Sequence, residues 1–224
     1  GPRGTGKTTT ARLLARALNC LDLAADGEPC GKCQNCLALA EGTFYDLVEL
    51  DAASNNGVEA MRELIQSVHL GLGASSRRKV YIVDEVHMLS AAASNTLLKT
   101  LEEPPPHVVF VLATTDPHKV LPTIRSRTQH FEFTLLTREQ LIGHLGDILG
   151  REGIEADDEV LDLVARKAAG SARDALSALE KLEVHVALEG GEGAPLPLRS
   201  MQARLLEELG RGEDALRVWE SVEA

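Results

Sequence analysis

The first eight residues, Gly1-Pro2-Arg3-Gly4-Thr5-Gly6-Lys7-Thr8, decide the fold of this chain. They satisfy the phosphate-loop pattern GxxxxGK[ST] at every fixed position, and the helical pattern of residues 8–18 follows at once. Glycines let backbone N–H groups turn inward around a phosphate, and the N-terminus of the helix adds its positive dipole. The pattern predicts that Lys7 reaches the β- and γ-phosphates of a nucleotide and that Thr8 ligates Mg²⁺. Seven residues are expected to contact nucleotide here: Gly1, Gly4, Thr5, Gly6, Lys7, Thr8 and Thr9.

Short apolar runs at 46–50, 79–83 and 108–113 predict buried strands, and helical patterns at 58–66 and 91–103 lie between them. Residues 129–133 are also expected to form a strand. Ser90 is the expected N-cap of the second helix, and three prolines after residue 103 end it. Strands that alternate with helices predict an α/β fold with a parallel sheet, whose ligands bind beyond the carboxyl ends of the strands. The alternative interpretation of residues 1–8 is a glycine-rich turn that binds no phosphate. Such a turn would not need to be followed by a helix and then by alternating strands and helices. Because a phosphate loop normally follows a strand, we expect this chain to lack its first strand.

From Thr137 onward the pattern is helical only. Thr137 with Gln140 forms a capping box, Asp157 or Asp158 caps a second helix, and Ser171 opens a third. The predicted domains are a nucleotide-binding domain at 1–135, a three-helix domain at 136–188, and a segment of uncertain assignment at 189–224. That last segment begins with a linker, and a helical hairpin follows at 198–209 and 213–223.

The net charge of −11 excludes a protein whose whole surface binds DNA through counterion release, so any DNA contact is local. An aromatic content of 3% argues against base-stacking platforms. Hydrophobic and charged fractions of 44% and 25% are ordinary for a globular protein. The chain has neither an apolar run long enough to span a bilayer nor a signal-peptide pattern at its start, so we expect a cytoplasmic protein without a membrane partner.

The apolar run Val80–Val83 ends in the acidic pair Asp84 and Glu85. Beside a phosphate loop, Asp84 is expected to hold Mg²⁺, and Glu85 to orient and polarise an attacking water. Strands often end in acidic residues without a catalytic role. The combination with the phosphate loop is what favours ATP hydrolysis.

Three further positions carry hydroxyl or guanidinium groups suited to phosphate. Thr115, after Thr114 at the end of the third strand, is placed to touch the γ-phosphate or its water. Arg127, in the run Arg125-Ser126-Arg127, is suited to act on a nucleotide held by a neighbouring subunit, and Arg173 is another phosphate candidate. Plain alternatives stay open: strand termination for the threonines, a solvated basic loop for Arg127, and an exposed helix arginine for Arg173.

All four cysteines of the chain, Cys20, Cys30, Cys33 and Cys36, follow the spacing C-x9-C-x2-C-x2-C. Four thiolates make a closed tetrahedral Zn²⁺ site with no position for water, which indicates a structural role. Disulfides are not expected in a cytosolic protein, and an iron–sulfur cluster is the main alternative.

Together these motifs resemble the gamma/tau subunits of bacterial DNA polymerase III, a family of AAA+ clamp-loader ATPases. The resemblance covers about residues 1–188. It rests on the phosphate loop and the cysteine insertion, and on DAAS at 51–54, VYIVDEVHMLS at 80–90, LLKTLEEPPPHV at 97–108, ATTDP at 113–117 and SRTQHF at 126–131.

The resemblance implies an AAA+ core with a zinc-binding insertion at about 20–40, a small all-α lid domain and a C-terminal helical segment. By position it makes Thr115 sensor 1, Arg127 the trans-acting arginine finger, and Arg173 sensor 2. Thr128 stands where many members have cysteine. The implied cofactors are ATP, Mg²⁺ and Zn²⁺. The implied partners are delta and delta-prime subunits, other gamma/tau copies, the beta sliding clamp and primed DNA, within a DNA polymerase (nucleotidyltransferase) holoenzyme.

Three other functions share parts of this pattern. A nucleoside monophosphate kinase can combine a phosphate loop with a four-cysteine lid, but its cysteines lie late in the chain. A P-loop ATPase of another DNA-processing machine shares the core motifs. A nucleotide-binding scaffold with little turnover, like delta-prime, is disfavoured by the intact phosphate loop and by Glu85, because a scaffold needs no catalytic carboxylate.

Overall fold

The structure, a computed structural model, describes residues 1–154 and 156–179 of the chain. Two compact units share these residues, and each has its own hydrophobic core. Gly1–Pro2 and Gly6–Phe133 form the first unit, whereas Arg3–Thr5 and the residues from Thr134 onward form the second. The linker and hairpin predicted at 189–224 lie outside the described residues.

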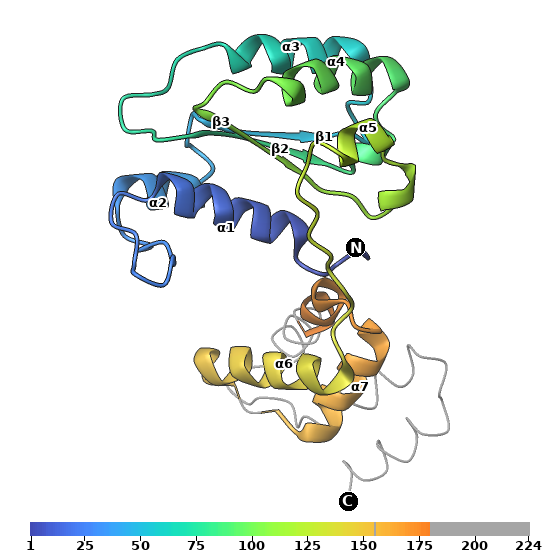
Figure 1. The fold of residues 1–224 in the computed structure, drawn as a ribbon. Coiled ribbons are helices and arrows are strands. Elements are labelled where there is room, and N and C mark those ends of the chain that lie inside the picture. The colour runs from blue at the N-terminus through green and yellow to red at the C-terminus, as the bar shows by residue number, and fades with distance from the viewer. Residues whose placement is uncertain (155, 180–224) are drawn as a thin grey trace, which may run out of the picture. The chain divides into compact units, whose positions relative to one another are not determined.

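A three-stranded parallel sheet organises the first unit (Figure 1). The strands lie in the order β1 (Leu47–Asp51), β2 (Lys79–Asp84) and β3 (Val108–Leu112). The central strand β2 is apolar because both of its faces are covered: Tyr81 and Val83 pack into one core, and Val80 and Ile82 into another. The three strands predicted from the sequence are confirmed to within one residue at each end.

Helices cover both faces of this sheet (Figure 1). On one face lie α3 (Val58–Val68) and α4 (Ala91–Glu102), and on the other lies α1 (Lys7–Asn19), with the short α2 (Gln34–Ala40) beside it. As predicted, Ser90 caps α4, because its Oγ accepts the N–H of Ala93 at 3.2 Å. Three one-turn elements complete the unit: η1 (Val86–Met88), η2 (Pro117–Lys119) and α5 (Pro122–Arg125).

The strand expected at 129–133 does not form. These residues follow α5 in an irregular conformation, and the described sheet contains β1, β2 and β3 alone. The prediction was wrong because aromatic side chains such as Phe131 and Phe133 favour a strand only where a neighbouring strand supplies hydrogen-bond partners. Residues 129–133 have no such ladder within the described chain.

The second unit is helical. It contains α6 (Arg138–Glu152), α7 (Asp158–Ala168) and a helical stretch at 172–179. The predicted capping box is present: Gln140 N–H donates to Thr137 Oγ1 at 3.2 Å, and Thr137 N–H donates to Gln140 Oε1 at 2.9 Å. The predicted cap of the third helix is also present, because Ser171 Oγ accepts the N–H of Asp174 at 3.3 Å.

Apolar side chains from all three helical segments pack into one core, which includes Leu141, Leu145 and Val164. Gly170 permits the turn before the last segment: its φ is +88°, and a Cβ there would lie 2.8 Å from the Leu136 carbonyl oxygen. Every helix within 1–154 and 156–179 is too short or too polar to span a bilayer.

Candidate nucleotide site and cysteine cluster

The phosphate loop enters α1 through a backbone conformation that favours glycine. Gly6 has a φ of +86°, and α1 begins at the next residue, Lys7. The Lys7 ammonium donates to the Pro2 carbonyl oxygen at 2.5 Å, so its side chain folds back along the loop. Gly1 lies beside the end of β3, since its nitrogen donates to the Thr114 carbonyl oxygen at 3.1 Å. Thr9 is exposed in the first turn of α1.

The start of α1 meets the carboxyl end of β2 through one short hydrogen bond. Thr8 Oγ1 donates to Asp84 Oδ2 at 2.6 Å, although 76 residues separate the two along the chain. The second oxygen, Asp84 Oδ1, accepts the backbone N–H of Glu85 at 2.9 Å. A hydroxyl and a carboxylate are hard oxygen ligands of the kind Mg²⁺ takes, so these two side chains fit that ion.

Glu85 follows β2 in a left-handed conformation, with φ +48° and ψ +43°. Such a backbone is strained in a residue with a Cβ and persists only where its surroundings fix it. Thr115 helps to hold Glu85 in this conformation, because its N–H and its Oγ1 both donate to Glu85 Oε2, at 3.0 and 2.8 Å. The backbone adds a bond from Val86 N–H to the Ala113 carbonyl oxygen at 3.0 Å.

This contact depends on the sheet register. Val83, the penultimate residue of β2, is paired with Leu112, the last residue of β3. Both strands run parallel, so the residues that follow them emerge at the same edge of the sheet. The structure therefore brings Thr8, Asp84, Glu85 and Thr115 together.

The two candidate arginines lie elsewhere. The Arg127 guanidinium forms an ion pair with Glu102 at the end of α4, at 2.8 Å, and donates to the Thr123 carbonyl oxygen at 2.9 Å. Arg173 belongs to the second unit, where its side chain is exposed and its backbone N–H donates to the Gly4 carbonyl oxygen at 3.4 Å.

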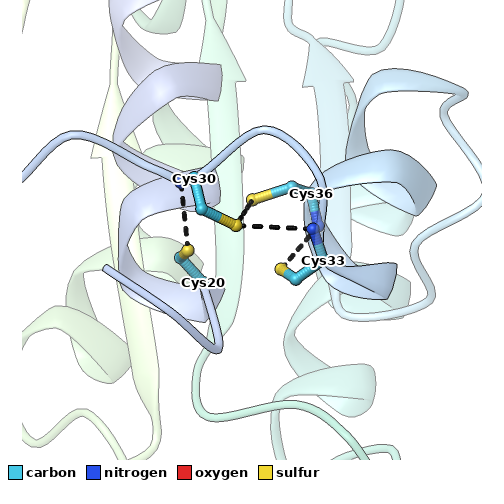
Figure 2. Close-up of side chains that lie close together, drawn as sticks. All are labelled: Cys20, Cys30, Cys33 and Cys36. Carbon is cyan, nitrogen blue, oxygen red and sulfur yellow. Dashed lines mark hydrogen bonds between the residues drawn. The ribbon is translucent and has the colours of Figure 1, made fainter. Parts of the chain in front are cut away.

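The four cysteine sulfurs converge at the far end of α1 (Figure 2). Cys20 is the C-cap of α1 and Cys33 the N-cap of α2, while Cys36 lies within α2. All four Sγ atoms lie within 4.8 Å of one another, and Cys30 Sγ is 4.0 Å from Cys36 Sγ. A Zn–S bond of about 2.3 Å in a tetrahedron places sulfurs roughly 3.8 Å apart, so the cluster is nearly at that spacing.

Backbone N–H groups point at three of these sulfurs. Cys30, Cys33 and Cys36 donate to the sulfurs of Cys20, Cys30 and Cys33, at 3.3, 3.4 and 3.4 Å. Donation by Cys30 N–H lowers the pKa of Cys20, and donation by Leu21 N–H lowers the pKa of Cys33 to about 6. Burial raises the pKa of Cys36 to about 12. The donors suit thiolates, whereas a buried thiolate at Cys36 requires a cation, so the donor set fits a metal ion.

A sequence model described as "DNA polymerase III, delta subunit" matches residues 1–137, more than half of the chain. A second, described as "DNA polymerase III clamp loader subunit, ATPase lid domain", matches residues 140–181. This chain belongs to the family of DNA polymerase III clamp-loader subunits. The four-cysteine cluster and the phosphate loop of this family member lie within the first matched region, and its helical unit lies mainly within the second.

Relatives of this clamp-loader chain carry the names of tau and gamma subunits. DNA polymerase III subunit tau of Bacillus subtilis is 47% identical over 181 residues, which cover 81% of this chain and 32% of the relative. Subunit gamma/tau of Mycobacterium tuberculosis is 50% identical over 184 residues, which cover 81% of this chain and 32% of the relative. Subunit tau of Escherichia coli is 49% identical over 193 residues, which cover 86% of this chain and 29% of the relative. The chain thus spans about a third of the length of these relatives.

Among solved structures, the Thermotoga maritima RuvB Holliday junction branch migration motor superposes with a TM-score of 0.63. The match covers 95% of this chain and 62% of that one at 18% sequence identity. At this identity the likeness concerns the fold alone. It agrees with the predicted AAA+ core followed by a helical lid.

Two features of this clamp-loader chain have no signal in its amino-acid sequence. The first is a hydrogen-bond network around two buried asparagines, Asn19 and Asn35. Asn19 Oδ1 accepts the N–H groups of Arg77 and Arg78 at 3.0 and 2.9 Å. Asn35 Nδ2 donates to the Asn19 and Ser75 carbonyl oxygens at 2.8 and 2.9 Å. The second is the ion pair between Glu102 and Arg127. Both join residues distant in sequence, and neither follows a motif with a fixed spacing.

Proposed function

We propose that this chain is the nucleotide-binding part of a clamp-loader motor subunit that binds and hydrolyses ATP to load a sliding clamp on primed DNA. The observation that carries the proposal is the hydrogen bond of 2.6 Å between Thr8 and Asp84. It joins the phosphate loop to the acidic end of β2, which is the arrangement that P-loop ATPases need. Family membership supports the choice of machine, since the relatives are gamma and tau subunits.

The residues of the loop bind and orient the triphosphate. The N–H groups around Gly6 and the N-terminus of α1 favour negative charge, and the Lys7 ammonium leaves the Pro2 carbonyl for the β- and γ-phosphates. Thr8 and Asp84 are the side chains that hold Mg²⁺. When bound, this ion offsets phosphate charge in the transition state.

Glu85 is the group that orients the attacking water. Within the described residues, all hydrogen bonds and ion pairs of its carboxylate are made by Oε2, so Oε1 is left to accept a proton from water. The left-handed backbone aims the side chain across the sheet edge toward Thr115. Thr115 thereby acts as a sensor that couples the Glu85 carboxylate to the γ-phosphate.

Arg127 and Arg173 complete the site by analogy with the family. Arg127 is exposed and held by Glu102 of its own subunit, which suits a finger that reaches the nucleotide of a neighbouring copy. Arg173 lies in the first turn of the last helical stretch of the lid and is exposed for a phosphate contact. The partners in this proposal are delta and delta-prime subunits, further copies of the chain, the beta clamp and primed DNA, in the cytoplasm.

Zn²⁺ is the metal proposed for Cys20, Cys30, Cys33 and Cys36. Four sulfurs with no histidine or carboxylate in the cluster suit zinc, and no position remains for a water ligand. The ion supplies structural cross-linking of α1 and α2 when bound. No catalytic step is assigned to it.

The decisive experiment measures ATPase turnover of the full-length protein alone and with delta, delta-prime, clamp and primed DNA. We expect strong stimulation by clamp and primed DNA together, which Lys7→Ala abolishes. Clamp-independent turnover at the stimulated rate would instead indicate an ATPase of another DNA-processing machine. Phosphate transfer to AMP would indicate a nucleotide kinase, and neither result is compatible with the proposal.

A further inference from the structure

The carboxylate of Glu85 has a third neighbour besides the two donors of Thr115. His87 Nδ1 lies 3.3 Å from Glu85 Oε2 and 2.9 Å from Thr114 Oγ1. The His87 side chain is only 10% exposed, so solvent does not compete strongly for this nitrogen. The site described so far makes no use of His87.

Local backbone geometry brings the imidazole to the carboxylate. Glu85 turns left-handed, and η1 follows it directly as a single tight turn, closed by the Met88 N–H bond to the Glu85 carbonyl oxygen at 2.8 Å. That turn folds His87 back over the residue two positions before it.

The neighbouring atoms favour a proton on Nδ1. A bare nitrogen lone pair facing a carboxylate oxygen at 3.3 Å is repulsive, whereas an N–H is attractive. Thr114 Oγ1 also accepts the N–H of Asp116 at 3.0 Å, and its second lone pair is free to accept from Nδ1–H. The protonated nitrogen is then shared between the Thr114 hydroxyl and Glu85 Oε2.

We propose that His87 is a positioning residue for ATP hydrolysis, which acts by donating from Nδ1 to the Glu85 carboxylate and so fixes its second oxygen toward the attacking water. Thr115 and His87 both contact Oε2, so two residues hold this oxygen and restrict rotation of the carboxylate group. This proposal rests on the proposed function, because it requires that Glu85 orients water. His87 contacts neither nucleotide nor metal in this assignment.

The test uses a matched pair of variants in the full-length protein, assembled with its partner subunits. His87→Asn places an amide nitrogen where Nδ1 lies, and His87→Leu has nearly the same size without a donor. We expect His87→Leu to lower kcat by on the order of tenfold, the effect of losing one hydrogen bond to a charged group, with the Kd for ATP unchanged within about twofold. We expect His87→Asn to retain most of the activity.

A double-mutant cycle with Glu85→Gln separates this proposal from the proposed function. If His87 acts through Glu85, the double variant Glu85→Gln with His87→Leu turns over no more slowly than Glu85→Gln alone. Equal loss in His87→Asn and His87→Leu, full activity in both, or additive losses in the double variant would each overturn the positioning role. Undiminished turnover in Glu85→Gln itself would overturn the role of Glu85, whatever the His87 variants show.

Thermal unfolding of each variant completes the test. A purely structural histidine predicts that activity follows the melting temperature and the ATP affinity. The positioning role predicts a loss of kcat in His87→Leu under conditions where the variant is fully folded and binds ATP normally. If His87→Leu does not fold, reduced turnover in folded His87→Asn with normal affinity contradicts the role, and near-normal turnover supports it.

Discussion

At the scale of single residues, the two oxygens of the Glu85 carboxylate differ, because within the described residues its hydrogen bonds and ion pairs are made by Oε2. This difference leads to a prediction for the variant Glu85→Gln. Glu85→Gln keeps the shape of the side chain and an oxygen that accepts from Thr115, but removes the charge that polarises water. We expect turnover to fall by about 10² to 10⁴, the usual contribution of a general base, while ATP affinity stays within a few-fold. Single-turnover kinetics and equilibrium nucleotide binding measure the two effects separately.

The matched control is Glu59→Gln, which removes an exposed carboxylate of α3 whose ion pair with Arg62 has little energetic value. It should leave turnover unchanged. Turnover of Glu85→Gln close to that of this control would show that water is oriented by another group.

The sequence was informative about which residues of the nucleotide site to consider and much less so about their contacts. Lys7, Thr8 and Asp84 belong to motifs whose spacing reflects phosphate and metal chemistry, so they can be identified from the sequence alone. The hydrogen bonds from Thr115 to Glu85, and the close approach of His87 to the same carboxylate, depend on the register of β2 against β3 and on the left-handed turn at Glu85. No local pattern encodes either feature.

At the scale of elements, Asn19 joins α1 to the segment that leads into β2. Its side chain is fully buried, and its Oδ1 accepts the N–H groups of Arg77 and Arg78. Asn19→Ala leaves both part-buried donors without this acceptor, and a donor that loses its partner costs about 1–3 kcal/mol, less where water reaches it. We therefore expect the free energy of unfolding to fall by roughly 2–4 kcal/mol, measured by urea denaturation.

Asn55→Ala serves as the control, because Asn55 is exposed and makes one bond of 3.3 Å to the Asp51 carbonyl oxygen. That variant should change stability by no more than about 0.5 kcal/mol. Equal effects of the two substitutions would mean that the hydrogen bonds of Asn19 do not stabilise the fold.

The cysteine cluster joins α1 to α2 and gives a second prediction at this scale. Cys33→Ser removes one sulfur ligand but keeps an N-cap acceptor for α2, because the serine hydroxyl can still receive the N–H of Cys36. We expect metal content to fall from one Zn²⁺ per chain to none, with a lower melting temperature and nearly unchanged ATP affinity, because the phosphate loop lies at the opposite end of α1. Elemental analysis measures the metal and also distinguishes zinc from iron.

Ser177→Ala, at an exposed position in the last helical stretch, is a control that should retain the metal. Retention of one zinc in Cys33→Ser would contradict the four-sulfur site. A chelator should lower the melting temperature of the unaltered protein and have no effect on Cys33→Ser, since metal binding energy is also folding energy.

Helices and caps were predictable where the signal is local. Ser90, Thr137 and Ser171 each cap the helix that follows them, and these bonds need only neighbours within three residues. The prediction of a strand at 129–133 was wrong because a strand needs more than local signals. Strand formation depends on a partner elsewhere in the chain, which the composition of a short segment does not reveal.

At the scale of the whole molecule, the pairing of Arg127 with Glu102 bears on how copies would cooperate. Both side chains are partly exposed, at 35% and 47%, so solvent screens the ion pair and the guanidinium can leave it at small cost. A triphosphate on a neighbouring copy carries more charge than one carboxylate and would attract the same guanidinium. Each subunit would then complete its neighbour's site.

Mixing two inactive variants tests this arrangement. Lys7→Ala impairs a subunit's own nucleotide site and keeps its Arg127, whereas Arg127→Ala keeps the site and removes the finger. If Arg127 acts on a neighbour, each variant alone is inactive in assembled loaders, but random mixing produces about a quarter of interfaces with an intact site facing an intact finger. Steady-state ATPase of the mixture should therefore recover, most strongly at equal proportions. An Arg127 that acted within its own subunit would give no recovery at any ratio, because no chain in the mixture would carry both Lys7 and Arg127.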